Sequence, residues 1–148
     1  MDRLPEIEVL GIDSIDQLPE CLPLREKYFT LLLAWDAPDA PRENLLETSR
    51  LLVSRGLVYF CAWGNNCEAV HDTVDRTDMV RLQRASIQDR VLMTTWHQDE
   101  SLEEAFWFFN TLAVPTEAPF ASEFQRFAVA IGNPGWAEAM KRALGRKR

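Results

Sequence analysis

Four stretches of the chain consist almost entirely of large apolar and β-forming residues, and helical patterns lie between them. The stretches cover residues 28–35, 57–63, 91–96 and 127–131. Apolar runs without regular polar alternation are typical of strands covered on both faces, as in a parallel sheet. Strands that alternate with helices form right-handed β-α-β units. The pattern predicts a three-layer α/β/α domain with a mainly parallel sheet of four to five strands, the fifth a short edge strand at residues 7–12.

Helix signals separate these strands. Ser101 and Glu104 form a capping box ahead of an apolar run, and Pro134 is suited to the first turn of a last helix. Residues 113–123 contain two prolines and are predicted as a long loop or a broken edge strand. The other helix boundaries are marked by Asp39, Pro41, Gly56, and either Asn65 or Asn66.

Two strand orders fit this succession of elements. In a flavodoxin-like or Rossmann-like order the strand at 91–96 adjoins the strand at 28–35, and a crevice opens between their carboxyl ends. The alternative is a thioredoxin-like fold, which ends in an antiparallel hairpin. Its active-site turn is similar to residues 63–67, Trp-Gly-Asn-Asn-Cys, but the first cysteine of the Trp-Cys-x-x-Cys pattern is missing here. Even in a thioredoxin-like fold, the chain would lack the cysteine pair that dithiol exchange requires.

The length of 148 residues is that of a single domain. We expect one unit over 1–148, with an N-terminal edge segment and connector at 1–27 and a basic tail at 141–148. No apolar run approaches the roughly 20 residues that a membrane span needs. The three cysteines match no disulfide framework, which favours a reducing, cytoplasmic location without membrane contact.

The charge distribution indicates which kinds of molecule the protein can bind. The net charge is −7, and residues 1–140 carry 11 basic and 23 acidic side chains. A strongly acidic body repels nucleic acid, so a nucleic-acid partner is not expected. The five cations of the tail are suited to the negative end of a C-terminal helix. We expect a protein partner or a small-molecule ligand.

Three strings along the chain carry a family resemblance. They are Cys-Ala-Trp-Gly at 61–64, Cys-Glu-x-x-His-Asp at 67–72, and Thr-Thr-Trp-His followed by Asp-Glu-Ser-Leu-Glu-Glu-Ala over 94–105. With them, the chain resembles a group of small bacterial proteins known only as a domain of unknown function. The resemblance covers about residues 28–145. It implies a bacterial cytosolic protein and implies no activity.

Tryptophans recur where the predicted strands end. Three strands close on Trp35, Trp63 and Trp96, and Trp136 follows the fourth. Open α/β sheets bind ligands outside the carboxyl ends of their strands, where these rings can stack on a planar ligand or merely fill gaps between strand and helix. The crevice of a flavodoxin-like order would have Trp96 and His97 at its centre. The predicted ligand-binding residues are Trp35, Asp36, Trp63, Asn65, Trp96, His97 and Asp99.

Thiol and imidazole groups form a second candidate set. Cys67 near a helix N-terminus and His97 at a strand end are candidates for a nucleophile and a base, with Asp36 or Glu100 beside them. If a metal were bound, its first ligands would be Cys67, His71, His97 and Cys61. Their spacing matches no standard zinc motif, and the ordinary alternative is a buried helix stripe. We therefore expect no metal and no cofactor.

Two hypotheses about function remain. The first is a small acidic binding or interaction module that recognises a protein partner or small ligand at the carboxyl edge of the sheet. The second is an enzyme that acts on a small polar or nucleotide-like substrate through His97 and Cys67. The chain has no phosphate loop, dinucleotide fingerprint, nucleophile elbow or zinc-protease motif, which favours the first.

Overall fold

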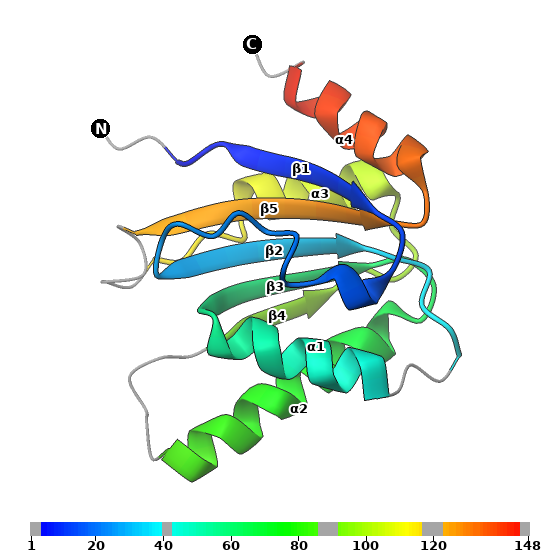
Figure 1. Ribbon diagram of the computed structural model, residues 1–148. Coiled ribbons are helices and arrows are strands. Elements are labelled where there is room, and N and C mark those ends of the chain that lie inside the picture. Colours follow the sequence, from blue (N-terminus) through cyan, green and yellow to red (C-terminus); the bar gives the residue numbers. More distant parts are fainter. Residues whose placement is uncertain (1–3, 40–42, 86–91, 117–122, 146–148) are drawn as a thin grey trace.

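The computed structural model describes residues 4–39, 43–85, 92–116 and 123–145 (Figure 1). In this part of the chain five parallel strands and four α-helices form a three-layer α/β/α domain, which confirms the predicted fold class. The elements are β1 (Ile7–Ile12), the 3₁₀ helix η1 (Ile15–Gln17), β2 (Tyr28–Ala34), α1 (Glu43–Ser54), β3 (Leu57–Trp63), α2 (Cys67–Ala85), β4 (Met93–Trp96), α3 (Leu102–Thr111), β5 (Phe124–Ile131) and α4 (Pro134–Gly145).

The strand order is β1-β5-β2-β3-β4, and all four ladders are parallel. From β2 the chain forms β3 and then β4, each on the outer side of the strand before it. It then crosses back to form β5 on the other side of β2. The change of direction, where α/β sheets bind ligands, thus lies between β2 and β5. The expectation that the third predicted strand adjoins the first is wrong, because β4 pairs with β3 at the edge of the described sheet. The parallel ladders also exclude the thioredoxin-like alternative.

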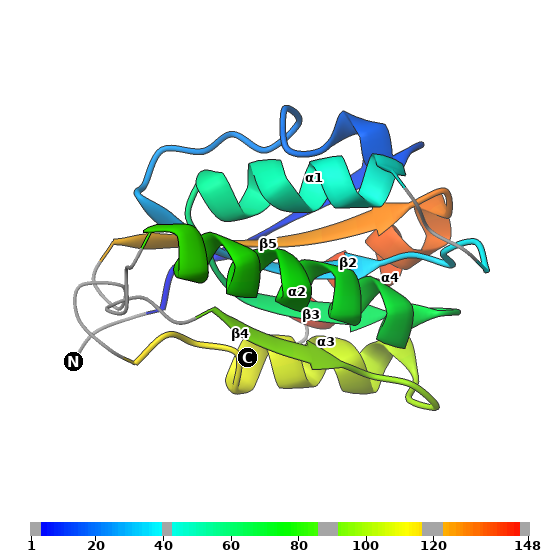
Figure 2. The same cartoon turned by 90° about the horizontal axis from the view of Figure 1, so that it is seen from below.

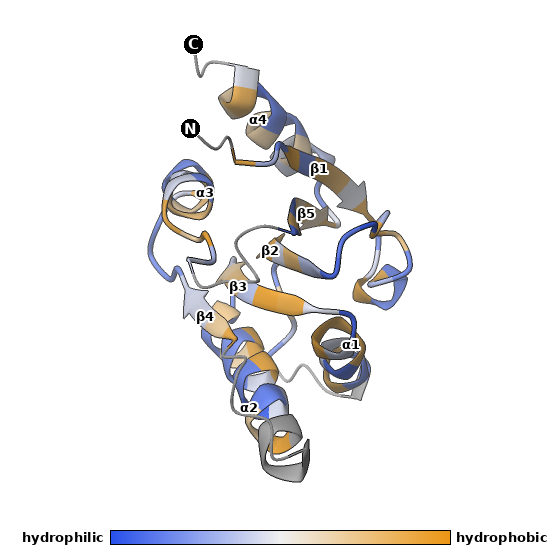
Figure 3. Cartoon of the chain, turned by 90° about the vertical axis from the view of Figure 1, so that its left-hand side faces the viewer, coloured by the Kyte–Doolittle hydropathy of each residue, from blue (hydrophilic) through white to orange (hydrophobic). Residues whose placement is uncertain are grey.

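Helices cover both faces of the sheet. α1 and α2 lie on one face together with η1, and α3 and α4 lie on the other (Figures 2 and 3). We call these the α1–α2 face and the α3–α4 face. Because successive strand residues point to opposite faces, each apolar strand supplies both layers of core. The large apolar residues of the central strands are buried, among them Leu31, Leu33, Val58, Phe60 and Val129, and so is Leu92 just before β4.

Helix boundaries follow the local signals. Ser101 Oγ accepts from the main-chain N–H of Glu104, and the Glu104 carboxylate accepts from that of Ser101, so the predicted capping box is present. α4 begins at Pro134 as predicted, and β5 begins three residues earlier than its pattern indicated. Some predictions lie outside the described residues: Pro41, Val91, residues 117–122 of the predicted loop and residues 146–148 of the tail.

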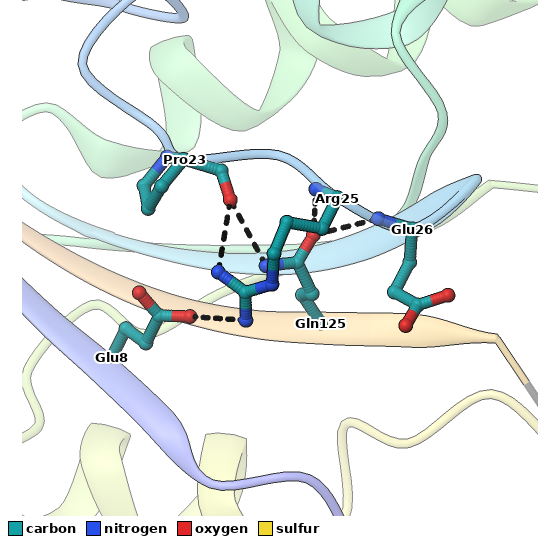
Figure 4. Close-up of polar contacts among 5 residues, drawn as sticks. All are labelled: Glu8, Pro23, Arg25, Glu26 and Gln125. Carbon is teal, nitrogen blue, oxygen red and sulfur yellow. Dashed lines mark hydrogen bonds and ion pairs between the residues drawn. The ribbon is translucent and has the colours of Figure 1, made fainter.

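A buried glutamine on β5 fixes the connector between β1 and β2 (Figure 4). Gln125 Oε1 accepts from the main-chain N–H groups of Arg25 (2.6 Å) and Glu26 (2.9 Å), and its Nε2 donates to the carbonyl of Pro23 (3.1 Å). The Arg25 guanidinium also pairs with Glu8 of β1 at 3.3 Å. One side chain therefore holds the connector where it enters β2, as a strand ladder would.

Candidate functional site

Three of the tryptophans at the carboxyl edge fill space between elements. The Trp63 ring packs edge-on against Trp136 of α4, with ring centroids 5.0 Å apart, and its Nε1 donates to the carbonyl of Glu100 at 2.7 Å. Trp35 is half-buried against the core of the α1–α2 face. These contacts close the junctions between strands and helices, which is the structural role considered for them.

Asp36 and Asn65 join the loops that follow β2 and β3. The main-chain N–H of Asn65 donates to Asp36 Oδ1 at 2.9 Å, and Ala37 N–H donates to the carbonyl of Asn65 at 3.0 Å. Gly64 permits this approach: its φ is +119°, and a Cβ there would lie 2.1 Å from the carbonyl oxygen of Trp35. Both predicted binding residues are exposed but already contribute hydrogen bonds to the loops.

His97 lies on the α3–α4 face and is only 5% exposed. Its Nε2 is 2.9 Å from Thr95 Oγ1 and its Nδ1 is 3.1 Å from Glu100 Oε1, so both ring nitrogens have partners. The ring packs against Phe108 of α3, with centroids 4.7 Å apart. The structure thus brings His97 and Glu100 together as proposed, while Asp99 stands exposed in the turn between them with φ +65°.

His71 and Trp96 lie together on the opposite, α1–α2 face. The His71 ring is 4.5 Å from the Trp96 ring, between centroids. Its Nδ1 is 2.8 Å from Asp72 Oδ1 and its Nε2 is 2.9 Å from Thr94 Oγ1, which donates to Asp75 Oδ1 at 3.2 Å. The buried imidazole is therefore fixed at both nitrogens, and it forms a rigid support for Trp96.

Neither the Cys61 thiol on β3 nor the Cys67 thiol on α2 is activated as a nucleophile. Burial raises the pKa of Cys67, an effect that a hydrogen bond from the main chain of His97 partly opposes. Burial also raises the pKa of Cys61 to about 12. Thiols are nucleophilic as thiolates, so both groups are in the unreactive, protonated form near neutral pH.

The four residues considered as metal ligands do not converge. Cys67 and His71 lie on the α1–α2 face, whereas Cys61 and His97 pack on the α3–α4 face. Among the residues that the structure describes, no three His, Cys, Asp or Glu side chains are grouped as a metal ion would require.

Two acids of α2 lie next to the residues that flank Trp96: Asp72 contacts the His71 ring, and Asp75 accepts from Thr94, which shares a face of β4 with Trp96. We define the Trp96 surface as Trp96 of β4 with Asp72, Asp75 and Met79 of α2. Asp72, Asp75 and Met79 line an open cavity of about 340 Å³ along α2, together with Arg76 and Val80. Sequence reasoning missed these three α2 residues, although their spacing at i, i+3 and i+7 places them on one helix face. A larger hollow of about 580 Å³, between α1 and the connector, contains none of the predicted site residues.

Comparison with known proteins places the chain in a family. No helix in the described part of the chain is long and apolar enough to cross a membrane. A search of the curated proteins finds no match. A family model matches residues 7–147, nearly the whole chain. The protein therefore belongs to the family described as Domain of unknown function (DUF7684).

Proposed function

We propose that this protein is a binding module without catalytic chemistry, and that it recognises another protein through the Trp96 surface. The observation that carries the proposal is the state of Trp96 itself. Its side chain is 43% exposed, yet its ring packs against a buried histidine whose two nitrogens are both bonded. Rigid, exposed aromatic rings are preferred anchors of protein interfaces because little conformational entropy is lost when they bind.

The contrast with the other rings at the carboxyl edge supports this role. Trp35 and Trp63 are half-buried and contact the helices that cover the sheet. Trp96 ends an edge strand and keeps much of its apolar area in water, where it contributes less to folding. A partner that covered the ring would remove this apolar area from water, and the hydrophobic effect would then favour binding.

The properties of the candidate catalytic groups favour binding over the enzyme alternative. Cys67 is buried with a raised pKa, and the His97 ring projects to the other face of the sheet. His97 and Glu100 form a pair that would suit a base and its orienting group, but a ring that is 5% exposed leaves little access for a substrate. The cavity along α2 is open to solvent, which suits a protein surface better than an enclosed small ligand.

The same proposal extends to location. The three cysteines, Cys21, Cys61 and Cys67, are all free thiols. Free thiols fit a reducing compartment, and we propose that the protein acts in the cytoplasm of a bacterium.

The test compares two exposed tryptophans. Trp96→Leu removes the proposed anchor, and Trp107→Leu removes a ring on α3 that is 59% exposed and lies outside the Trp96 surface. Immobilised wild-type protein and both variants are incubated with a lysate of the source organism, and the captured proteins are quantified by mass spectrometry. We expect a specific partner whose affinity falls about 5- to 30-fold in Trp96→Leu, or roughly 1–2 kcal/mol, and is unchanged in Trp107→Leu.

Thermal unfolding of the same variants separates binding from stability. Both melting temperatures should stay close to that of the wild type. If Trp96→Leu lowers the melting temperature while capture per folded molecule is unchanged, Trp96 is a structural plug and the proposal is wrong.

A further inference from the structure

The outer side of β4 carries main-chain groups that no neighbouring strand of the described sheet receives. β4 pairs with β3, and the N–H of His97 donates to the carbonyl of Ala62 at 2.9 Å. Main-chain groups of successive strand residues point to alternate sides of the strand. The main-chain groups of His97 point toward β3, and therefore those of Thr95 and Met93 do so too. The main-chain N–H and C=O groups of Thr94 and Trp96 point outward, away from β3.

The side chains of β4 do not protect this edge in the usual manner. Proteins commonly guard free edges with lysine, proline, a β-bulge or an inward-pointing charge. β4 reads Met-Thr-Thr-Trp, its register with β3 is regular, and its exposed side chains are Met93 (51%) and Trp96 (43%). Apolar side chains therefore flank the outward main-chain groups on both faces of the sheet.

The charge near this edge selects among possible occupants. Asp72 and Asp75 of α2 lie on the same face as Trp96, where Asp72 contacts His71 and Asp75 accepts from Thr94. Arg76 lines the same cavity, so one cation stands beside the two aspartates. Asp99 and Glu100, in the turn between β4 and α3, are exposed and add two more acids. A second copy of the chain would bring a net charge of −7 toward these acids. A positively charged partner is attracted instead.

We propose that a cationic, extended segment of the partner protein adds to β4 as a sixth strand. The segment exchanges main-chain hydrogen bonds with Thr94 and Trp96, as in other complexes formed by strand addition. On the α1–α2 face, an apolar side chain packs on Trp96, and lysine or arginine side chains at alternate positions face Asp72 and Asp75. The inference rests on the proposed function, since it specifies how the Trp96 surface would be used.

The dimensions of β4 set the expected length of the added strand. Four residues of β4 offer two outward residues, and hence four main-chain groups. Such a short ladder provides limited affinity by itself, so the contacts with Trp96 and the two aspartates must contribute. This combination predicts binding that depends on a short alternating segment and that weakens as salt is added.

The experiment uses a displayed library of random eight-residue peptides, selected on the full-length protein. We expect enrichment of peptides in which lysine or arginine residues and one apolar residue stand at alternate positions, and so on one face of the added strand. Each amide of one enriched peptide is then N-methylated in turn. Methylation at positions whose N–H faces β4 should weaken binding at least tenfold, and methylation at the intervening positions should change it less than twofold.

Protein variants and amide exchange give an independent measurement. Asp72→Asn with Asp75→Asn keeps hydrogen-bond acceptors and removes both charges, and we expect about tenfold weaker peptide binding. Glu47→Gln on α1, an exposed acid in the other hollow, is the matched control and should have no effect. Hydrogen exchange at the amides of Thr94 and Trp96 should slow at least tenfold when peptide is bound.

The outcomes distinguish the two proposals. Selected peptides that need Trp96 but tolerate methylation at every position would refute strand addition and leave the Trp96 surface in place. Failure to enrich cationic alternating peptides would also refute strand addition, as would sedimentation of the free protein as a dimer whose contact protects Thr94 and Trp96. A cellular partner that binds Trp96→Leu as tightly as wild type would instead refute the proposed function.

Discussion

Replacing Gln125 by methionine tests how residues 4–27 are attached to the rest of the domain. Methionine keeps the length of the side chain and its packing, and removes both polar atoms. Three main-chain groups of the connector then lose their partner, the N–H groups of Arg25 and Glu26 and the carbonyl of Pro23. All three bonds are partly buried, so water replaces them incompletely.

The expected loss follows from this count. A typical intramolecular hydrogen bond contributes about 1 kcal/mol net, and a buried group left without a partner costs about 1–3 kcal/mol. Arg25 and Glu26 have exposed side chains, so we take the lower value for each of the three groups. Gln125→Met should therefore lower the free energy of unfolding by about 3 kcal/mol.

Urea unfolding followed by circular dichroism measures this difference. Gln98→Met, at an exposed position after β4, is the matched control and should change the unfolding free energy by less than about 0.5 kcal/mol. Native-state hydrogen exchange should show faster exchange at the amides of Arg25 and Glu26 in Gln125→Met. If the unfolding free energy falls by less than about 0.5 kcal/mol and exchange at both amides is unchanged, Gln125 does not hold the connector as described.

Two further predictions concern the core and the carboxyl edge. Gly64→Ala should lower the unfolding free energy by at least about 2 kcal/mol, because the residue has positive φ and its Cβ would collide with the Trp35 carbonyl; chemical denaturation measures this, and a neutral effect would show that the loop adapts. Stability should fall as the pH rises from about 9 toward 12, because the pKa of Cys61 is raised to about 12 in the folded protein and the thiol ionises first in the unfolded chain. Urea unfolding between pH 8 and 10.5 should show a shallower decline in Cys61→Ala, and equal slopes would contradict the assignment.

The strands and helices were predictable because local patterns determine them. The apolar runs of β2, β3 and β5 and the capping box at Ser101 are visible in the sequence alone. The strand order was not, because the hydropathy of β4 does not reveal on which side of β2 the chain returns. That choice depends on contacts between distant residues, such as those of Gln125 with the connector.

The candidate site was predicted in part. The sequence identified Trp96 and His97 as neighbours, but grouped them in one crevice. Adjacent strand residues point to opposite faces, so Trp96 packs on His71 of α2 while His97 packs on Phe108 of α3. Strand alternation alone is sufficient to place the two side chains on opposite faces. The contribution of Asp75 required knowledge of which face of α2 meets β4.

The pairing of β1 with β5 determines the order in which the molecule can be completed. Ile7 aligns with Arg126, so the first strand pairs with a segment more than a hundred residues later in the chain. Such distant pairing slows folding, because a long loop must close before any contact is gained. During synthesis β1 therefore cannot form its native pairing until β5 has left the ribosome. Because the connector is also held by β5, through Gln125, we expect residues 4–27 to join the domain in the last folding step, after β2, β3 and β4 have packed beneath α1 and α2.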